Sequence, residues 1–148
     1  MKKILLLITI LLLCGCKSTE LKKYESYIKE LKTSNISEDI PFDISISIDE
    51  FTNAEYMYKV IIDNPKKELK NIEALVIHDM PTEDIYPSSG IFDDKYNLLP
   101  NDINKDINNA KGIILIGYIN DNKDITFKVL VKYEEDNKIN TIIYSTKK

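Results

Sequence analysis

His78 is the only histidine of the chain, so it is the only imidazole available as a catalytic base. Ser88 and Ser89 are the serines nearest to it, and a serine hydrolase would have to combine one of them with His78. No Gly-x-Ser-x-Gly motif surrounds either serine, and the geometry of a triad is too specific to follow from these residues alone. We therefore expect His78 to be a strand residue near a sheet edge, with its hydrogen-bonding groups satisfied.

Alternating oxygen-bearing side chains in the second half of the chain have the spacing of calcium ligands. Asp102, Asn104 and Asp106 stand at every second position. An EF-hand loop that began at Asp102 would have Ile107 in place of its glycine and Ile113 in place of its bidentate glutamate. The pattern excludes an EF-hand and leaves two alternatives, a weak calcium site or a solvated polar loop.

The charge of the chain limits its partners. The formal net charge is -4, and every one of the 20 basic residues is lysine. A chain of this charge lacks the basic face that nucleic acid binding requires. Without arginine it also lacks the usual bidentate clamp for phosphate or carboxylate substrates. We expect no nucleic acid partner, no cofactor and no enzymatic activity.

The N-terminal segment has the pattern of a secretory signal. Two lysines follow Met1, and an apolar run extends from Ile4 to Leu13, interrupted only by Thr9. At about 1.5 Å per residue, ten helical residues reach about 15 Å, which is half the thickness of a bilayer core. The run is therefore too short for a spanning helix, and it fits the apolar region of a signal peptide.

The residues that end this segment, Leu13-Cys14-Gly15-Cys16, resemble the lipobox of bacterial lipoproteins. Leu13 supplies the aliphatic residue three positions before the modified cysteine, and Gly15 supplies the small residue directly before it. The resemblance implies that Cys16 carries a diacylglycerol and that cleavage precedes it. It also implies acylation with fatty acids such as palmitate, and a location on the extracytoplasmic face of the cell membrane.

We predict three segments: a signal peptide (1–15), a lipid-anchored tether with a short helix (16–38) and a β-sandwich domain (39–148). The tether helix is indicated by Leu21, Tyr24, Ile28 and Leu31, whose spacings of three, four and three place them on one helix face. A coiled-coil seam is the alternative, but the segment is shorter than the three or four heptads that it requires.

Strand patterns fill most of the predicted domain. Apolar and polar residues alternate over 42–48, 55–62 and 125–133, while 72–78 and 112–119 are more continuously apolar and 139–144 forms the last strand. Because 112–119 is almost entirely apolar, we expect it to be a central strand. Lys128 and Lys132 are expected to face water. Turn residues between the strands, with no amphipathic helices, indicate an antiparallel β-sandwich.

The strand arrangement resembles an immunoglobulin-like sandwich. The resemblance rests on the segment from Tyr58 to Asn64, followed by Leu69 to Leu75, which is similar to the paired central strands of small extracellular modules in Gram-positive lipoproteins. The Cys-Trp-Cys pattern of antibody domains is absent. The resemblance therefore implies an all-β, immunoglobulin-like fold and no functional residue.

The segment from Met80 to Lys111 lacks a long alternating pattern and contains three of the five prolines. We interpret Ser88-Ser89-Gly90 as a turn and Ile91-Phe92 as a short edge strand. The segment is either an elaborated crossover or a binding loop, since loops on rigid scaffolds often carry binding residues. The candidate residues of the binding loop are Tyr86, Phe92, Asp93, Asp94 and Tyr96.

These patterns favour a non-enzymatic, lipid-anchored surface module that binds a protein or another component of the cell envelope. A carbohydrate- or calcium-binding envelope module is the alternative. The carbohydrate version needs clustered tyrosines, of which the chain has nine. An enzyme or accessory subunit that uses His78 and the loop carboxylates is the less favoured alternative.

Overall fold

The computed structural model describes residues 19–53, 55–81, 88–100, 109–110, 112–121 and 123–148. In these described residues, one helix, α2 (Thr19–Thr33), precedes eight strands. The strands are β1 (Asp43–Thr52), β2 (Glu55–Asp63), β3 (Leu69–His78), β4 (Ser88–Leu98), β5 (Asn109–Ala110), β6 (Gly112–Ile119), β7 (Thr126–Glu135) and β8 (Lys138–Lys147).

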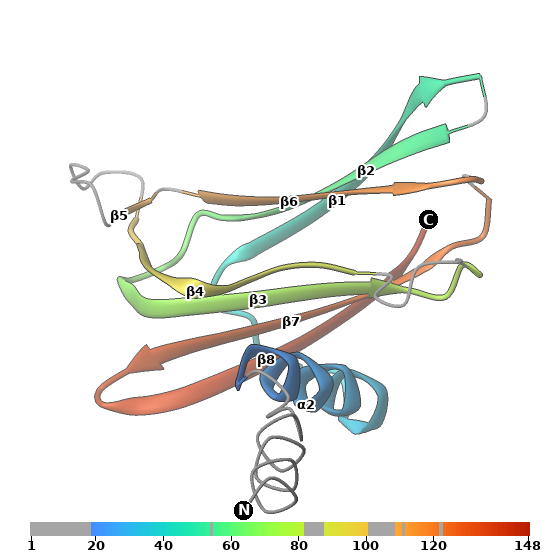
Figure 1. Ribbon diagram of the computed structural model, residues 1–148. Helices are drawn as coiled ribbons and strands as arrows, with labels where there is room; N and C mark the ends of the chain where they lie inside the picture. Colours follow the sequence, from blue (N-terminus) through green and yellow to red (C-terminus); the bar gives the residue numbers. More distant parts are fainter. Residues whose placement is uncertain (1–18, 54, 82–87, 101–108, 111, 122) are drawn as a thin grey trace, which may run out of the picture.

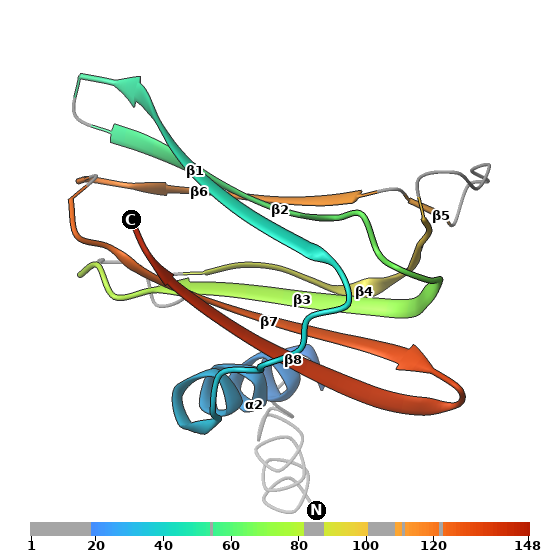
Figure 2. The ribbon, with the colours of Figure 1, turned by 180° about the vertical axis from the view of Figure 1, so that it is seen from behind.

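The elements form three layers (Figure 1). A three-stranded sheet in the order β1-β2-β6 packs on a five-stranded sheet in the order β5-β4-β3-β7-β8. Helix α2 covers the other face of the five-stranded sheet, and Figure 2 shows the same layering from behind. Neighbouring strands are antiparallel except for the short β4–β5 pair. The predicted antiparallel β-sandwich with one preceding helix is confirmed.

The main core lies between the two sheets, where the alternating residues of each strand meet. Tyr58, Val60 and Ile62 of β2 are buried. On the neighbouring strand β6, the buried residues Leu115 and Ile113 pair with Val60 and Ile62. This is the inward face that the period-two pattern of 55–62 predicts. Burial of these aliphatic and aromatic side chains provides the main driving force for the fold.

A second, smaller core joins α2 to the five-stranded sheet. Its buried members are Tyr27, Leu31, Leu75, Ile77, Leu130 and Ile143, and Tyr24, Ile28 and Phe92 pack against them. The predicted helix face is therefore correct for Tyr24, Ile28 and Leu31. The helix lies on the five-stranded sheet, and Leu31 is completely buried there.

Polar contacts reinforce this helix–sheet interface. Glu73 of β3 accepts hydrogen bonds from Lys23 and from the Tyr27 hydroxyl of α2. Lys132 of β7 forms an ion pair with Glu30 at 2.7 Å, and its Nζ lies 4.4 Å from the centre of the Tyr27 ring. Burial, together with the nearby Glu73 and Glu30 carboxylates, raises the pKa of Tyr27.

The prediction that Lys128 and Lys132 face water is wrong. Both side chains are half-buried and lie under α2, where Lys128 Nζ also approaches the Leu31 carbonyl oxygen at 3.4 Å. Period-two alternation places lysines on the face away from the main core, and here that face is covered by the helix. Their long stems add to the apolar interface while their charged ends bind helix groups.

Asparagine and aspartate provide the left-handed backbone conformations of the fold. Asp136 and Asn137 have φ angles of 50° and 60° and form the β7–β8 hairpin turn. Asn71, with φ of 49°, lies where the register of β3 shifts. Its amide donates to Glu134 on β7 at 2.7 Å, and its backbone N–H donates to Asn97 on β4 at 3.2 Å. The β-bulge is thus held from both neighbouring strands.

Two strand predictions need correction. Segment 112–119 is the predicted strand β6, but it lies at an edge of the three-stranded sheet and is not central. Ser88-Ser89-Gly90 is not a turn, because these residues begin β4 and pair with β3. A glycine is required here: a Cβ on Gly90 would lie 2.7 Å from the Phe92 ring.

The strand order β1-β2-β6 against β4-β3-β7-β8 corresponds to strands A-B-E against C′-C-F-G of immunoglobulin-type sandwiches. The immunoglobulin-like class remains a prediction, and this order is the observation that supports it.

Candidate functional site

The outer face of the three-stranded sheet, on the side away from the main core, carries large exposed apolar side chains. Ile114, Ile116 and Tyr118 of β6 are 57%, 46% and 55% exposed, and Phe51 at the end of β1 is 55% exposed. The rings of Phe51 and Tyr118 contact each other with their centres 5.1 Å apart. We call Phe51, Ile114, Ile116 and Tyr118 the outer-face patch.

The registers of β1, β2 and β6 show which residues continue this patch. Ile61 and Met57 of β2, both half-buried, pair with Ile114 and Tyr118 and extend the apolar surface onto β2. Between them, Lys59 pairs with Ile116 and forms an ion pair with Asp49 of β1 at 3.0 Å. Because Lys59 and Asp49 have opposite charges, this ion pair adds no net charge beside the patch. Contiguous apolar surface of this kind commonly marks an interaction site.

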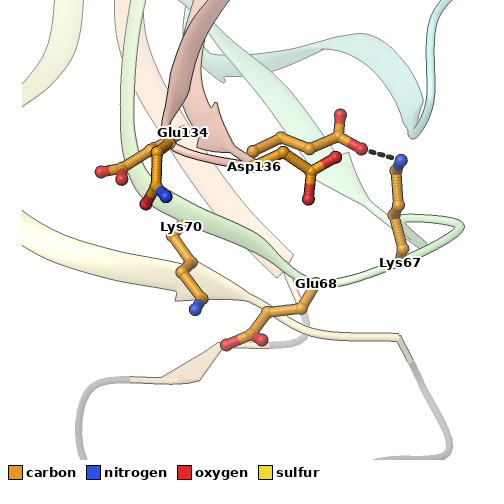
Figure 3. Close-up of a pocket in the computed structure, with 7 residues that line it drawn as sticks. Lys67, Glu68, Lys70, Glu134 and Asp136 are labelled. Carbon is orange, nitrogen blue, oxygen red and sulfur yellow. Dashed lines mark ion pairs between the residues drawn. The ribbon is translucent and has the colours of Figure 1, made fainter.

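A polar depression of about 390 Å³ (Figure 3) lies at the β7–β8 turn, at the end of the sandwich opposite the end of β1 (Figure 1). It is lined by the β2–β3 connection and the β7–β8 turn, through Lys67, Glu68, Lys70, Glu134, Glu135, Asp136 and Asn137. Lys67 forms an ion pair with Glu135, shown by the dashed line in Figure 3. All seven lining residues are polar or charged, and none has an aromatic side chain that could stack on a sugar.

His78 lies at the end of the main core, beside aromatic side chains. Its ring is 5.7 Å from the Tyr58 ring and 6.1 Å from the Phe127 ring, between centres. In the described part of the chain, no side chain or backbone group hydrogen-bonds to His78 Nδ1. Ser88 pairs through its backbone with Ile77, the residue before His78. His78 is a packed strand residue, as the sequence predicts. The prediction is wrong in its other two parts, because β3 is the middle strand of the five-stranded sheet and Nδ1 has no hydrogen-bond partner among the described residues.

Burial gives His78 a pH-dependent effect on stability. Desolvation lowers the pKa of His78 below 6.5, although the nearby Asp79 acts in the opposite direction. Because the folded-state pKa lies below the unfolded one, protonation favours the unfolded chain. The stabilisation by neutral His78 is therefore complete above about pH 6.5 and falls as the pH decreases through the folded pKa.

We expect urea unfolding to show this loss between about pH 7.5 and about pH 5, and we expect the loss to be smaller in a His78→Gln variant. Comparison of the two slopes of unfolding free energy against pH isolates the histidine from the carboxylates. Equal slopes for the natural sequence and His78→Gln over this pH range would show that burial does not lower the pKa of His78.

The structure assigns Phe92 and Tyr96, two members of the predicted binding loop, to strand β4. Phe92 is half-buried and packs against α2, with its ring 6.0 Å from Tyr24 and 5.8 Å from Tyr27, between centres. Tyr96 is half-buried and pairs with Ile72 of β3. Phe92 is therefore committed to helix packing and does not present a free binding surface.

The remaining predicted site residues are not tested by the described structure. Asp93 and Asp94 belong to β4, but their side chains lie outside the description. Tyr86 lies outside the described residues, as do Leu13, Cys14, Gly15 and Cys16 and the calcium candidates Asp102, Asn104 and Asp106. Within the described ranges, no cluster of three or more histidine, cysteine or acidic side chains could hold a metal ion.

The burial of two tyrosines bears on the carbohydrate-binding alternative. Tyr58 and Tyr133 are buried, and burial raises the pKa of Tyr58 to about 12, so these two rings are core residues and do not form a sugar-binding face.

In the part of the chain that the structure describes, no helix has the length and apolar character needed to cross a membrane. No family model, curated protein or solved structure matches the chain.

Proposed function

We propose that the chain is a lipid-anchored, extracytoplasmic β-sandwich that binds a protein or another envelope component without catalysis. The lipobox resemblance of Leu13 to Cys16 supports the anchor. Helix α2 begins at Thr19, three residues after Cys16, and three residues span at most about 11 Å. A lipid on Cys16 would hold the start of α2 close to the membrane surface.

The observation that carries the binding role is the outer-face patch and its position relative to α2. Helix α2 covers the outer side of the five-stranded sheet, and the patch lies on the outer side of the other sheet. An anchor beside α2 therefore leaves the patch on the side of the sandwich away from the anchored helix. Apolar side chains that are about half exposed there favour contact with a protein over contact with water.

Capture from solubilised membranes tests this role with the intact protein as bait. A double variant, Ile114→Lys with Tyr118→Lys, adds charge to the patch without changing a buried side chain. We expect it to capture at least about tenfold less of the bound component, which corresponds to a loss of about 1.4 kcal/mol.

The matched control is Ile139→Lys, which changes a residue that is 77% exposed on β8 of the other sheet. This control should capture as much as the natural sequence. Equal capture by all three proteins would contradict a binding role of the patch.

A further inference from the structure

The four edges of the two sheets differ in their protection against pairing with another strand. The edge strand β1 carries Asp43, Asp49 and Glu50 and a register shift near its end. The edge strand β8 carries Lys138 and Lys147, and β5 is only two residues long. Charges, bulges and short length are the common means by which proteins protect sheet edges.

Strand β6 has none of these protections. Its eight residues include no charged residue and no proline, and its register with β2 is unbroken from Gly112 to Ile119. Among the described strands, β6 pairs with β2 alone. A regular, uncharged and apolar edge strand is a template for addition of another strand.

We infer that β6 pairs with β6 of a second copy of this chain, antiparallel and centred on Ile116. This inference rests on the proposed binding role of the outer-face patch, because the pairing places Ile114, Ile116 and Tyr118 of two copies beside one another along the joined edge. In this register Ile116 lies opposite Ile116 of the second copy, and Ile114 lies opposite Tyr118. The pairs combine β-branched and aromatic side chains, which are favourable neighbours across strands. No charge opposes a like charge, although the chain as a whole is negative.

The symmetry of this pairing also fits one membrane. Residues that lie directly opposite each other in antiparallel strands point to the same face of the sheet. The two-fold axis through Ile116 is therefore perpendicular to the sheet, and the outer faces of both copies point in the same direction. Both α2 helices then lie on the same side of the dimer, so both lipid anchors can enter the same bilayer. Anchoring raises the effective concentration of the copies, which favours even a weak pairing.

Disulfide cross-linking in membranes tests the pairing with the full chain. In the variant Ile116→Cys, oxidation is expected to link two copies, because directly opposite Cα atoms lie about 4.5–5.5 Å apart and a disulfide needs about 4.4–6.8 Å. Ile114→Cys and Tyr118→Cys are expected to form no disulfide-linked dimer when expressed alone, because their cysteines do not lie opposite each other, and to cross-link with each other when co-expressed.

Ile139→Cys, on β8, is the matched control and is expected to form no disulfide-linked dimer. The inference is overturned if Ile116→Cys forms no dimer, or if Ile139→Cys forms dimers as readily. Cross-linking of Ile116→Cys to a different protein would reject the second copy as occupant while supporting the proposed binding role. If Ile116→Cys forms no cross-link and the Ile114→Lys, Tyr118→Lys variant captures as much as the natural sequence, both the β6–β6 pairing and the binding role of the outer-face patch are rejected.

Discussion

Cys16→Ala is expected to abolish the acylated form of the protein, because no other cysteine follows the predicted cleavage point. One acyl chain binds a bilayer only marginally, and stable anchoring requires a second hydrophobic or electrostatic contribution. The segment after Cys16 carries 18 lysines and 24 acidic residues, so its net negative charge provides no attraction to anionic lipids. The variant chain is expected either to be released or to remain attached through its uncleaved leader.

Mass spectrometry of the N-terminal peptide from detergent-extracted protein distinguishes these results. The natural sequence should begin at Cys16 with an acyl mass on that residue, and Cys14→Ala should behave in the same way. The Cys16→Ala chain should carry no acyl mass. An unmodified N-terminus at another residue in the natural protein would contradict the proposed anchor and location.

The side-chain patterns predicted the sandwich because alternation reports directly which side of a strand is buried. In the segment 55–62, alternate positions proved to be the buried ones, including Val60 and Ile62 at 0% exposure. The helix face was also predictable, since Leu31 lies at the correct spacing and is completely buried. Both predictions use information within a single element.

The order of strands was not predictable in the same way, and the candidate site depends on it. The apolar run 112–119 is compatible with a central strand buried on both faces, but only pairing over long distances decides which strands flank it. Here one face of β6 packs in the core and Ile114, Ile116 and Tyr118 remain exposed. The wrong prediction for 112–119 therefore concerns the same strand that carries the outer-face patch, an apolar edge strand.

The predicted binding loop shows a second limit of local patterns. Ser88-Ser89-Gly90 suggested a turn, because small residues are typical of turns, and Ile91-Phe92 suggested a short edge strand after it. In the structure, Gly90 allows the Phe92 ring to lie close to the backbone of β4, and Phe92 then packs on α2. A helix that lies far away in the sequence decides the role of this aromatic residue.

Gly117→Ala should destabilise the fold by about 1–3 kcal/mol, which is typical of overpacking in a core. Gly117 of β6 pairs with Tyr58 of β2, and a Cβ at Gly117 would lie 2.2 Å from the Tyr58 hydroxyl oxygen. Tyr58 is only 2% exposed and packs against the Phe127 ring, with centres 5.2 Å apart. Its ring therefore cannot move without disturbing the main core.

Urea unfolding followed by tyrosine fluorescence measures this effect, since the chain has nine tyrosines and no tryptophan. Gly112→Ala is the matched control on the same strand, because its new Cβ would meet Asp63 Cβ at 3.0 Å, a contact that a small displacement at the end of β6 relieves. The control substitution should lower the free energy of unfolding by less than about 1 kcal/mol. Adding Tyr58→Leu should remove most of the extra cost of Gly117→Ala, because a smaller side chain leaves room for the new methyl group. Strictly additive effects of the two substitutions would show that the contact between Gly117 and Tyr58 does not limit the packing of β6.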